Sequence, residues 1–184
     1  MASHPVFIRN ITHLTDARYF AAMGVDWISI KLHSDPASFS FWHSLRDWVE
    51  GLKLAAETEE DDEMLLSKII IDARPEGIVL GHLDFVHLTG GLELFVAAEE
   101  FTSDLHQHGI NLILPYRHGV TETKLFSGIP SDQIFLESDW NEQSISDVKS
   151  SGYSGGFCFR STPESKTGVK DFSDFDLMLE LIRE

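Results

Sequence analysis

The chain has 184 residues, of which 42% are hydrophobic, and its formal net charge is -16. This length and composition exclude a disordered chain and fit one folded domain, so we expect residues 1–184 to form a single domain. The acidic charge argues against nucleic acid as a partner, because two polyanions repel each other. The only cysteine, Cys158, excludes an internal disulfide.

The same features bear on localisation. Residues 1–10 lack a basic segment followed by a long apolar run, and no apolar stretch is long enough to span a bilayer. A single cysteine is typical of a reducing compartment. We therefore expect a cytoplasmic protein without a membrane partner.

The first unit of the chain sets the pattern for the rest. An apolar run at Val6–Ile11 is followed by an amphipathic segment that ends at Gly24, and then by a second apolar run at Trp27–Leu32. Thr15 suits the N-cap of a helix in this segment, and glycine is favoured just after a helix ends. The pattern predicts two parallel strands joined by a crossover helix.

The alternation continues along the chain. Further strands are expected at Leu52–Ala56, Phe85–Leu88, Ile110–Leu114, Ile134–Leu136 and Phe157–Arg160. Helices are expected at Phe39–Val49, Asp62–Ala73, Leu92–Gln107, Thr121–Phe126, Glu142–Ser150 and Phe175–Ile182. Ile78–Gly81 fits either a turn or a short strand. Alternating strands and helices predict an α/β fold with a parallel sheet, either closed or open.

Two features could suggest a metal or a cofactor. The segment Glu57–Glu63 carries six carboxylates in seven residues, but a solvated loop that favours the next helix N-terminus is the preferred interpretation. The histidines lack the spacing of known metal motifs, and neither common glycine-rich nucleotide loop is present. We therefore expect no metal and no cofactor.

Several segments resemble one known family in order and approximate spacing. They are FIRNIT at Phe7–Thr12, Asp16-Ala17, Gly24–Asp26, LDFVHLTG at Leu83–Gly90, Ser161–Glu164 and GVKD at Gly168–Asp171. They are similar to the KICGIT, DA, GAD, LDVVQLHG, SSGVE and GVKD motifs of the phosphoribosylanthranilate isomerases of tryptophan biosynthesis. The resemblance implies a TIM-type (β/α) barrel of parallel strands, with a phosphorylated substrate bound at the C-terminal strand ends.

The chain departs from this family at the residues that carry the reaction. The family's general base, a cysteine on strand one, falls on Arg9, and its general acid, an aspartate on strand six, falls on Glu137. Glutamate keeps the carboxylate, but arginine stays protonated at neutral pH and cannot act as a base. The family's substrate-binding arginine after strand two has no counterpart in Ser34–Ser38. The resemblance therefore leaves open whether the protein is an enzyme.

The interval between Glu137 and Phe157 is short. It holds 19 residues, where the family has a complete βα unit, and Gly155-Gly156 could be a remnant of the family's phosphate-binding glycines. We expect one βα unit to be missing or vestigial. The barrel would then have about seven clear strands and be incomplete or distorted.

Side-chain alternation along the strands places Arg9, Glu137 and Arg160 at one mouth of the barrel. One interpretation is an anion pocket with two guanidinium groups, in which Ser161 and Thr162 offer backbone N–H groups to a phosphate, as the resemblance implies. The other is an internal ion network that fills the space of a substrate. Cys158, between two phenylalanines, is expected to be a buried, inert thiol.

Three functions follow. The leading hypothesis is a diverged isomerase-like barrel that binds a small phosphorylated or anionic metabolite and lacks the family's acid/base pair. The second is an active isomerase that catalyses the Amadori rearrangement, with Glu137 as acid and His87 or Glu57 as base. The third is a non-catalytic protein-interaction scaffold. An open sheet edge would favour this scaffold or a homodimer.

Overall fold

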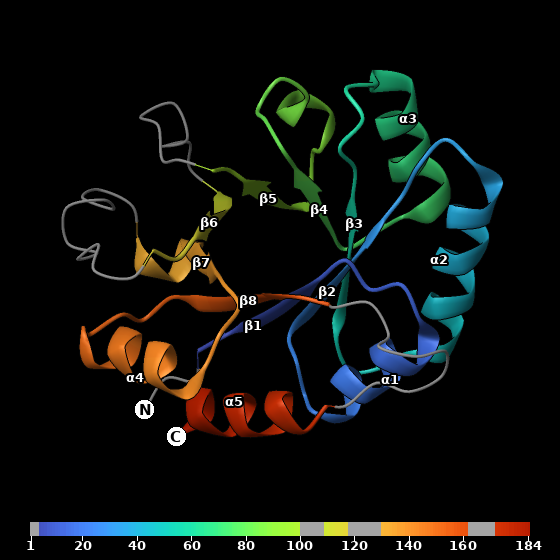
Figure 1. The fold of residues 1–184 in the computed structure, drawn as a ribbon. Helices are drawn as coiled ribbons and strands as arrows, with labels where there is room; N and C mark the ends of the chain where they lie inside the picture. The colour runs from blue at the N-terminus through green and yellow to red at the C-terminus, as the bar shows by residue number, and fades with distance from the viewer. Residues whose placement is uncertain (1–3, 100–108, 118–129, 162–171) are drawn as a thin grey trace.

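The computed structural model describes residues 4–99, 109–117, 130–161 and 172–184 (Figure 1). Eight parallel strands close into a barrel in chain order. They are β1 (Val6–Arg9), β2 (Trp27–Lys31), β3 (Lys53–Glu57), β4 (Gly77–Leu80), β5 (Glu93–Ala97), β6 (Ile110–Pro115), β7 (Ile134–Glu137) and β8 (Gly156–Arg160). The predicted TIM-type (β/α) barrel is confirmed.

Helices lie outside the ring of strands (Figure 1). The described residues form α1 (Leu14–Ala22), α2 (Pro36–Trp48), α3 (Glu63–Lys68) with its π-helical continuation η1 (Ile69–Ala73), the short 3₁₀ turns η2 (Val86–Leu88) and η5 (Ser131–Gln133), α4 (Glu142–Ser150) and α5 (Ser173–Arg183). The predicted helix Thr121–Phe126 and the end of the predicted helix Leu92–Gln107 lie outside the described residues.

Side-chain caps explain where some helices begin. The Asp62 carboxylate, in the acidic segment 57–63, accepts hydrogen bonds from the N–H groups of Met64 and Leu65 at the start of α3. This is the structural role predicted for that segment. The first helix differs from the prediction, because α1 begins at Leu14 and its N-cap residue is His13 rather than Thr15.

The expectation of about seven strands in an incomplete barrel is wrong. The residues between Glu137 and Gly156 hold α4, and the strands on both sides of α4 pair with each other, so no unit is missing there. The shortened connection is residues 81–92 between β4 and β5, where the predicted strand Phe85–Leu88 is the 3₁₀ turn η2. The predicted helix from Leu92 instead opens with strand β5. Leucine, glutamate and alanine favour helices in isolation, but the ladders to β4 and β6 override that preference.

The lower part of the barrel interior is filled by aromatic side chains. The ring centroids of Phe7, Phe95 and Phe135 lie 4.9 to 6.0 Å apart, and Trp27 packs at 5.0 Å from Phe95. A Cβ atom on Gly156 would come within 2.3 Å of the Phe135 ring. Gly156 is therefore needed for packing at the start of β8. Layers of side chains from alternate strands are typical of such barrels.

Candidate functional site

A charged layer lies above the aromatic one, at the carboxyl ends of the strands. Arg9 comes from β1, Glu57 from β3 and Glu137 from β7, and the fourth odd-numbered strand, β5, contributes Ala97. Each lies two residues beyond an inward-facing residue of its strand, which puts it on the same face of the sheet. Three of the four odd strands therefore place a charge inside the mouth, and the fourth places a methyl group there.

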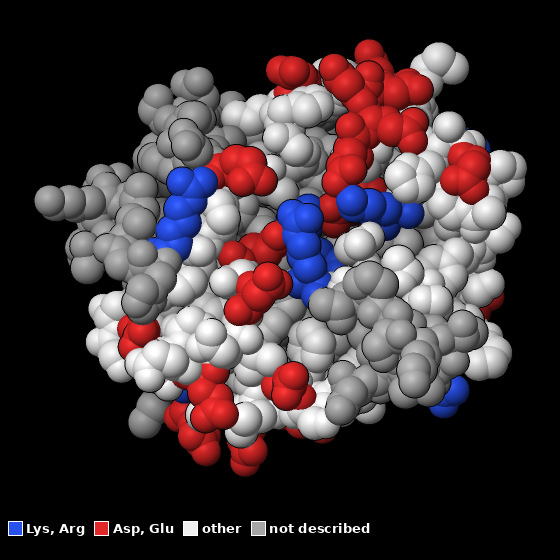
Figure 2. All heavy atoms as spheres, in the orientation of Figure 1, with Lys and Arg blue, Asp and Glu red and all other residues white. Residues whose placement is uncertain are grey.

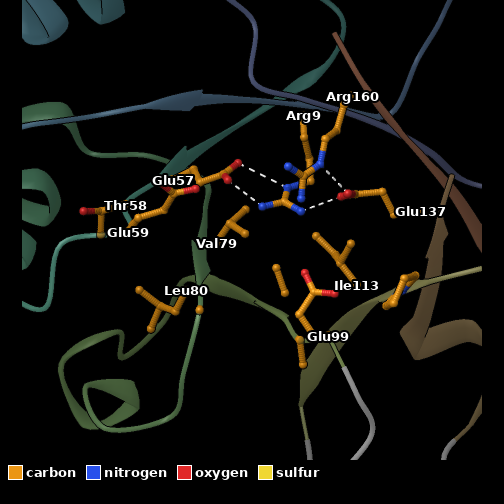
Figure 3. A pocket seen from close by; sticks show the side chains of 14 residues that line it. Arg9, Glu57, Thr58, Glu59, Val79, Leu80, Glu99, Ile113, Glu137 and Arg160 are labelled. Atoms are coloured by element: carbon orange, nitrogen blue, oxygen red, sulfur yellow. Dashed lines mark hydrogen bonds and ion pairs between the residues drawn. The ribbon is translucent and has the colours of Figure 1, made fainter. Parts of the chain in front are cut away.

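Arg9 is held between two carboxylates (Figure 3). Its Nε donates to Oε2 of Glu57 at 3.2 Å, its Nη2 to Oε1 of Glu57 at 2.5 Å, and its Nη1 to Oε2 of Glu137 at 2.5 Å. Arg160 Nε donates to the other oxygen of Glu137, and the Ser29 hydroxyl donates to Glu57 Oε2 at 2.9 Å. Because two guanidinium groups face two carboxylates, the network as a whole is neutral.

The environment fixes the charge of these groups. Burial by itself would raise the pKa of Glu137, but the charges and hydrogen bonds of Arg9 and Arg160 outweigh it and hold that pKa below its usual value of 4.5. Burial opposes the charge of Arg9, yet Glu57 and Glu137 raise the pKa of its guanidinium above the usual value. Near neutral pH Arg9 and Glu137 are therefore both ionised, and Glu137 has no proton to donate as a general acid.

Cys158 lies beneath this network and is fully buried. Burial and the neighbouring charge of Glu137 raise the pKa of its thiol well above the usual value. Its sulfur lies 3.7 Å from Glu137 Oε2. These surroundings favour the neutral thiol, which is a poor nucleophile.

The other residues predicted for the site lie apart from this cluster. Ser161 donates its backbone N–H to the Arg9 carbonyl at 2.8 Å and its hydroxyl to Asp16 at 3.2 Å, so its N–H belongs to the pairing of β8 with β1 rather than to a phosphate. Thr162 lies outside the described residues. His87 is exposed on η2, where its Nδ1 is 3.2 Å from the Asp84 carbonyl, and it does not line the mouth.

Strand order also changes the correspondence with the isomerase family. Glu137 ends β7, whereas the family's aspartate belongs to strand six. The sixth strand of this barrel is Ile110–Pro115, which has no acidic residue. The prediction that Glu137 occupies the strand-six position is therefore wrong. It arose because β4 and β5 were not both recognised from the sequence.

A cavity of about 170 Å³ opens above the network. Apart from the network, it is lined by the carboxylates of Glu59 and Glu99 and by apolar side chains that include Val79, Ala97 and Ile113. Lys31 pairs with Glu59 at 2.6 Å and lowers the pKa of that carboxyl. Figure 2 shows this face with a few basic side chains at its centre between acidic ones. Sequence reasoning missed Glu99, which lies two residues beyond the end of strand β5 and would have been recognised as a strand-end residue if β5 had been predicted.

The described residues contain no group of three or more histidine, cysteine, aspartate or glutamate side chains placed to hold a metal ion. Within the same residues, no helix combines the length and the apolar character that crossing a bilayer requires.

The comparisons with known proteins give matches among solved structures. No protein-family model and no curated protein matches the sequence. The phosphoribosylanthranilate isomerase of Thermus thermophilus matches with a TM-score of 0.74 at 15% identity. The corresponding enzyme of Pyrococcus furiosus matches with a TM-score of 0.74 at 12% identity. Both comparisons cover 97% of this chain and 98% of the other. The chain has the fold of the phosphoribosylanthranilate isomerases.

A third structure of this kind is an isomerase in complex with reduced 1-(o-carboxyphenylamino)-1-deoxyribulose 5-phosphate, with a TM-score of 0.75 and 11% identity. The match covers 97% of this chain and 98% of the chain in that structure. A truncated 3-deoxy-D-arabino-heptulosonate 7-phosphate synthase from Thermotoga maritima also matches, with a TM-score of 0.60. At such identities the likeness establishes the barrel, and function has to be argued from the site.

Proposed function

We propose that this barrel binds a small anionic or phosphorylated metabolite at the carboxyl ends of its strands and does not catalyse the isomerase reaction. The observation that carries the proposal is Arg9, a permanent cation at the centre of the mouth that two carboxylates hold in place.

The chemistry of the rearrangement supports the second half of the proposal. An Amadori-type rearrangement needs one group to protonate the ring oxygen and another to remove a proton from carbon 2, on facing sides of the substrate. In the described part of the mouth, Glu57 and Glu137 are both bound to Arg9, and Glu137 is ionised. Glu137 therefore cannot supply the acid of such a pair.

Size points the same way. Pockets for drug-sized ligands have volumes of roughly 300–1,000 Å³. The cavity of about 170 Å³ is smaller than this range. This volume suits a small carboxylate or inorganic phosphate better than a compound that combines a carboxyphenyl group with a sugar phosphate.

Arg160 is the group that would contact the anion. Its side chain is 57% exposed, and its Nε is directed to Glu137, so, as far as the described residues are concerned, the terminal amino groups of the guanidinium remain for a ligand at the opening. Arg9 is only 6% exposed and would form the floor beneath it. The predicted scaffold function is less favoured, because the open sheet edge on which it depended does not exist in a closed barrel.

Two measurements test the proposal. Phosphoribosylanthranilate turnover, followed by the loss of its fluorescence at high protein concentration, is expected to stay at the background rate. Titration with propionate and with inorganic phosphate, followed by calorimetry, is expected to show binding that Arg160→Gln abolishes. Arg18→Gln on α1 removes an exposed arginine outside the cavity and is the matched control. Turnover that Glu137→Gln abolishes, or anion binding that Arg160→Gln leaves unchanged, would contradict the proposal.

A further inference from the structure

The charges that line the cavity do not cancel completely among the described residues. Arg9, Arg160, Glu57 and Glu137 form the neutral network, and Glu59 pairs with Lys31. The carboxylate of Glu99 makes no ion pair with the described part of the chain. Arg117 reaches only its backbone oxygen, at 3.5 Å.

Glu99 lies on the wall opposite the two arginines. Figure 3 shows its side chain rising from the end of β5 with the carboxylate directed into the cavity, while Arg9 and Arg160 lie on the other side. Val79, Ala97 and Ile113 line the space between these charged walls. The cavity therefore has a cationic end with exposed guanidinium donors on Arg160, an apolar middle and an anionic end, where the Glu99 carboxylate makes no ion pair with the residues that the structure describes.

We propose that the ligand is a small zwitterion of the α-amino-acid type. Its carboxylate would accept hydrogen bonds from the terminal amino groups of Arg160, and its ammonium group would donate to Glu99. This inference rests on the proposed anion-binding function and narrows its ligand to one chemical class.

The volume limits the size of that zwitterion. An apolar cavity of about 150 Å³ holds benzene, a molecule of six carbon atoms. The cavity of about 170 Å³ accordingly suits a molecule such as glycine, alanine or serine. A ligand side chain as small as a methyl group would rest against Ala97, the uncharged residue that β5 contributes to the layer of Arg9, Glu57 and Glu137.

Ligands with only one of the two charges are poorer matches. A simple carboxylate of the same size accepts hydrogen bonds from Arg160, but it has no positive charge to pair with Glu99. A simple amine satisfies Glu99 and leaves the donors of Arg160 to water. A zwitterion satisfies both ends, and each charge-assisted hydrogen bond contributes measurably to affinity.

Three probes of similar size separate these cases: L-alanine, propionate and ethylamine. Each is titrated into the full chain near neutral pH and at low salt, with binding followed by protein-observed NMR. We expect L-alanine to bind at least about tenfold more tightly than propionate or ethylamine. Glu99→Gln should weaken L-alanine by about tenfold and leave propionate unchanged or tighter. Glu180→Gln on α5 removes the same charge outside the cavity and should change neither.

The outcomes distinguish this inference from the proposed function. If L-alanine and propionate bind equally, both through Arg160, the anion site stands and the zwitterion is wrong. If ethylamine binds most tightly, or if Glu99→Gln leaves the affinity for L-alanine unchanged, the zwitterion is also wrong. If no probe and no inorganic phosphate binds, the proposed function itself fails.

Discussion

Replacing Arg9 with methionine tests how the mouth of the barrel is held together. Methionine has similar length and no charge, so Arg9→Met removes the central cation and keeps most of the packing. Glu137 retains Arg160, but Glu57, whose side chain is 3% exposed, keeps only the Ser29 hydroxyl among the partners that the described residues provide. Removing one partner of a buried pair costs about 3–5 kcal/mol.

Proton uptake by the unpaired carboxylate sets an upper limit on the stability cost of Arg9→Met. A carboxylate that loses its buried partner can take up a proton instead of keeping its charge. Since a glutamate usually titrates near pH 4.5 and each pH unit corresponds to about 1.4 kcal/mol, this route costs about 3.4 kcal/mol near pH 7 and about 0.7 kcal/mol near pH 5. The stability loss of Arg9→Met should therefore shrink by about 3 kcal/mol between these two pH values.

Urea unfolding at both pH values measures the loss in the free energy of unfolding. Near pH 7 this loss corresponds to a melting temperature of Arg9→Met about 10 °C below that of the wild-type protein. Adding Glu57→Gln to Arg9→Met should recover most of the stability near pH 7, because the amide leaves no charge to bury. Lys31→Met breaks the exposed pair with Glu59 and should cost less than about 1 kcal/mol.

The reasoning is refuted if Arg9→Met costs less than about 1 kcal/mol near pH 7. It is also refuted if the cost is the same at both pH values, because Glu57 would then not be the group that loses its partner.

Three further predictions concern the same barrel. The two arginines lower the pKa of Glu137 below 4.5, so the ionised carboxylate contributes fully to stability above pH 4.5. The stability advantage of the wild-type protein over Glu137→Gln should disappear as the pH falls through the lowered pKa of Glu137, which urea unfolding at several pH values measures. Ala97→Leu should fill the cavity and abolish L-alanine binding in NMR titrations, at a stability cost of about 1–3 kcal/mol. Gly156→Ala should lower the melting temperature by at least about 4 °C because its Cβ would collide with Phe135, whereas Gly90→Ala, with nothing within 4 Å, should change it little; equal effects would contradict the packing account.

The sequence supported good predictions where the deciding property is local. Side-chain alternation on β1, β7 and β8 correctly brought Arg9, Glu137 and Arg160 to one mouth, because direction along a strand depends only on spacing. The internal ion network, one of the two interpretations left open, is the arrangement of these three side chains in the structure, and Glu57 completes it.

Predictions failed where the outcome depends on distant pairing. The strands β4 and β5 are only four and five residues long, and β5 is composed largely of residues that also suit a helix. Only their ladders to β3 and β6 make them strands. The errors in strand number and in the strand that carries Glu137 followed from these two elements, and for the same reason Glu99 was not recognised as a strand-end residue.

The sequence by itself determined the class of fold and a permanent cation, Arg9, at the end of the first strand, since a guanidinium keeps its proton wherever it is placed. Only the tertiary structure decided that the barrel closes with eight strands, that Glu57 is the main partner of Arg9, and that Glu99 faces the two arginines across a small cavity. These outcomes depend on hydrogen bonds and charges between residues far apart in the chain, and no local pattern specifies which of many possible partners will meet.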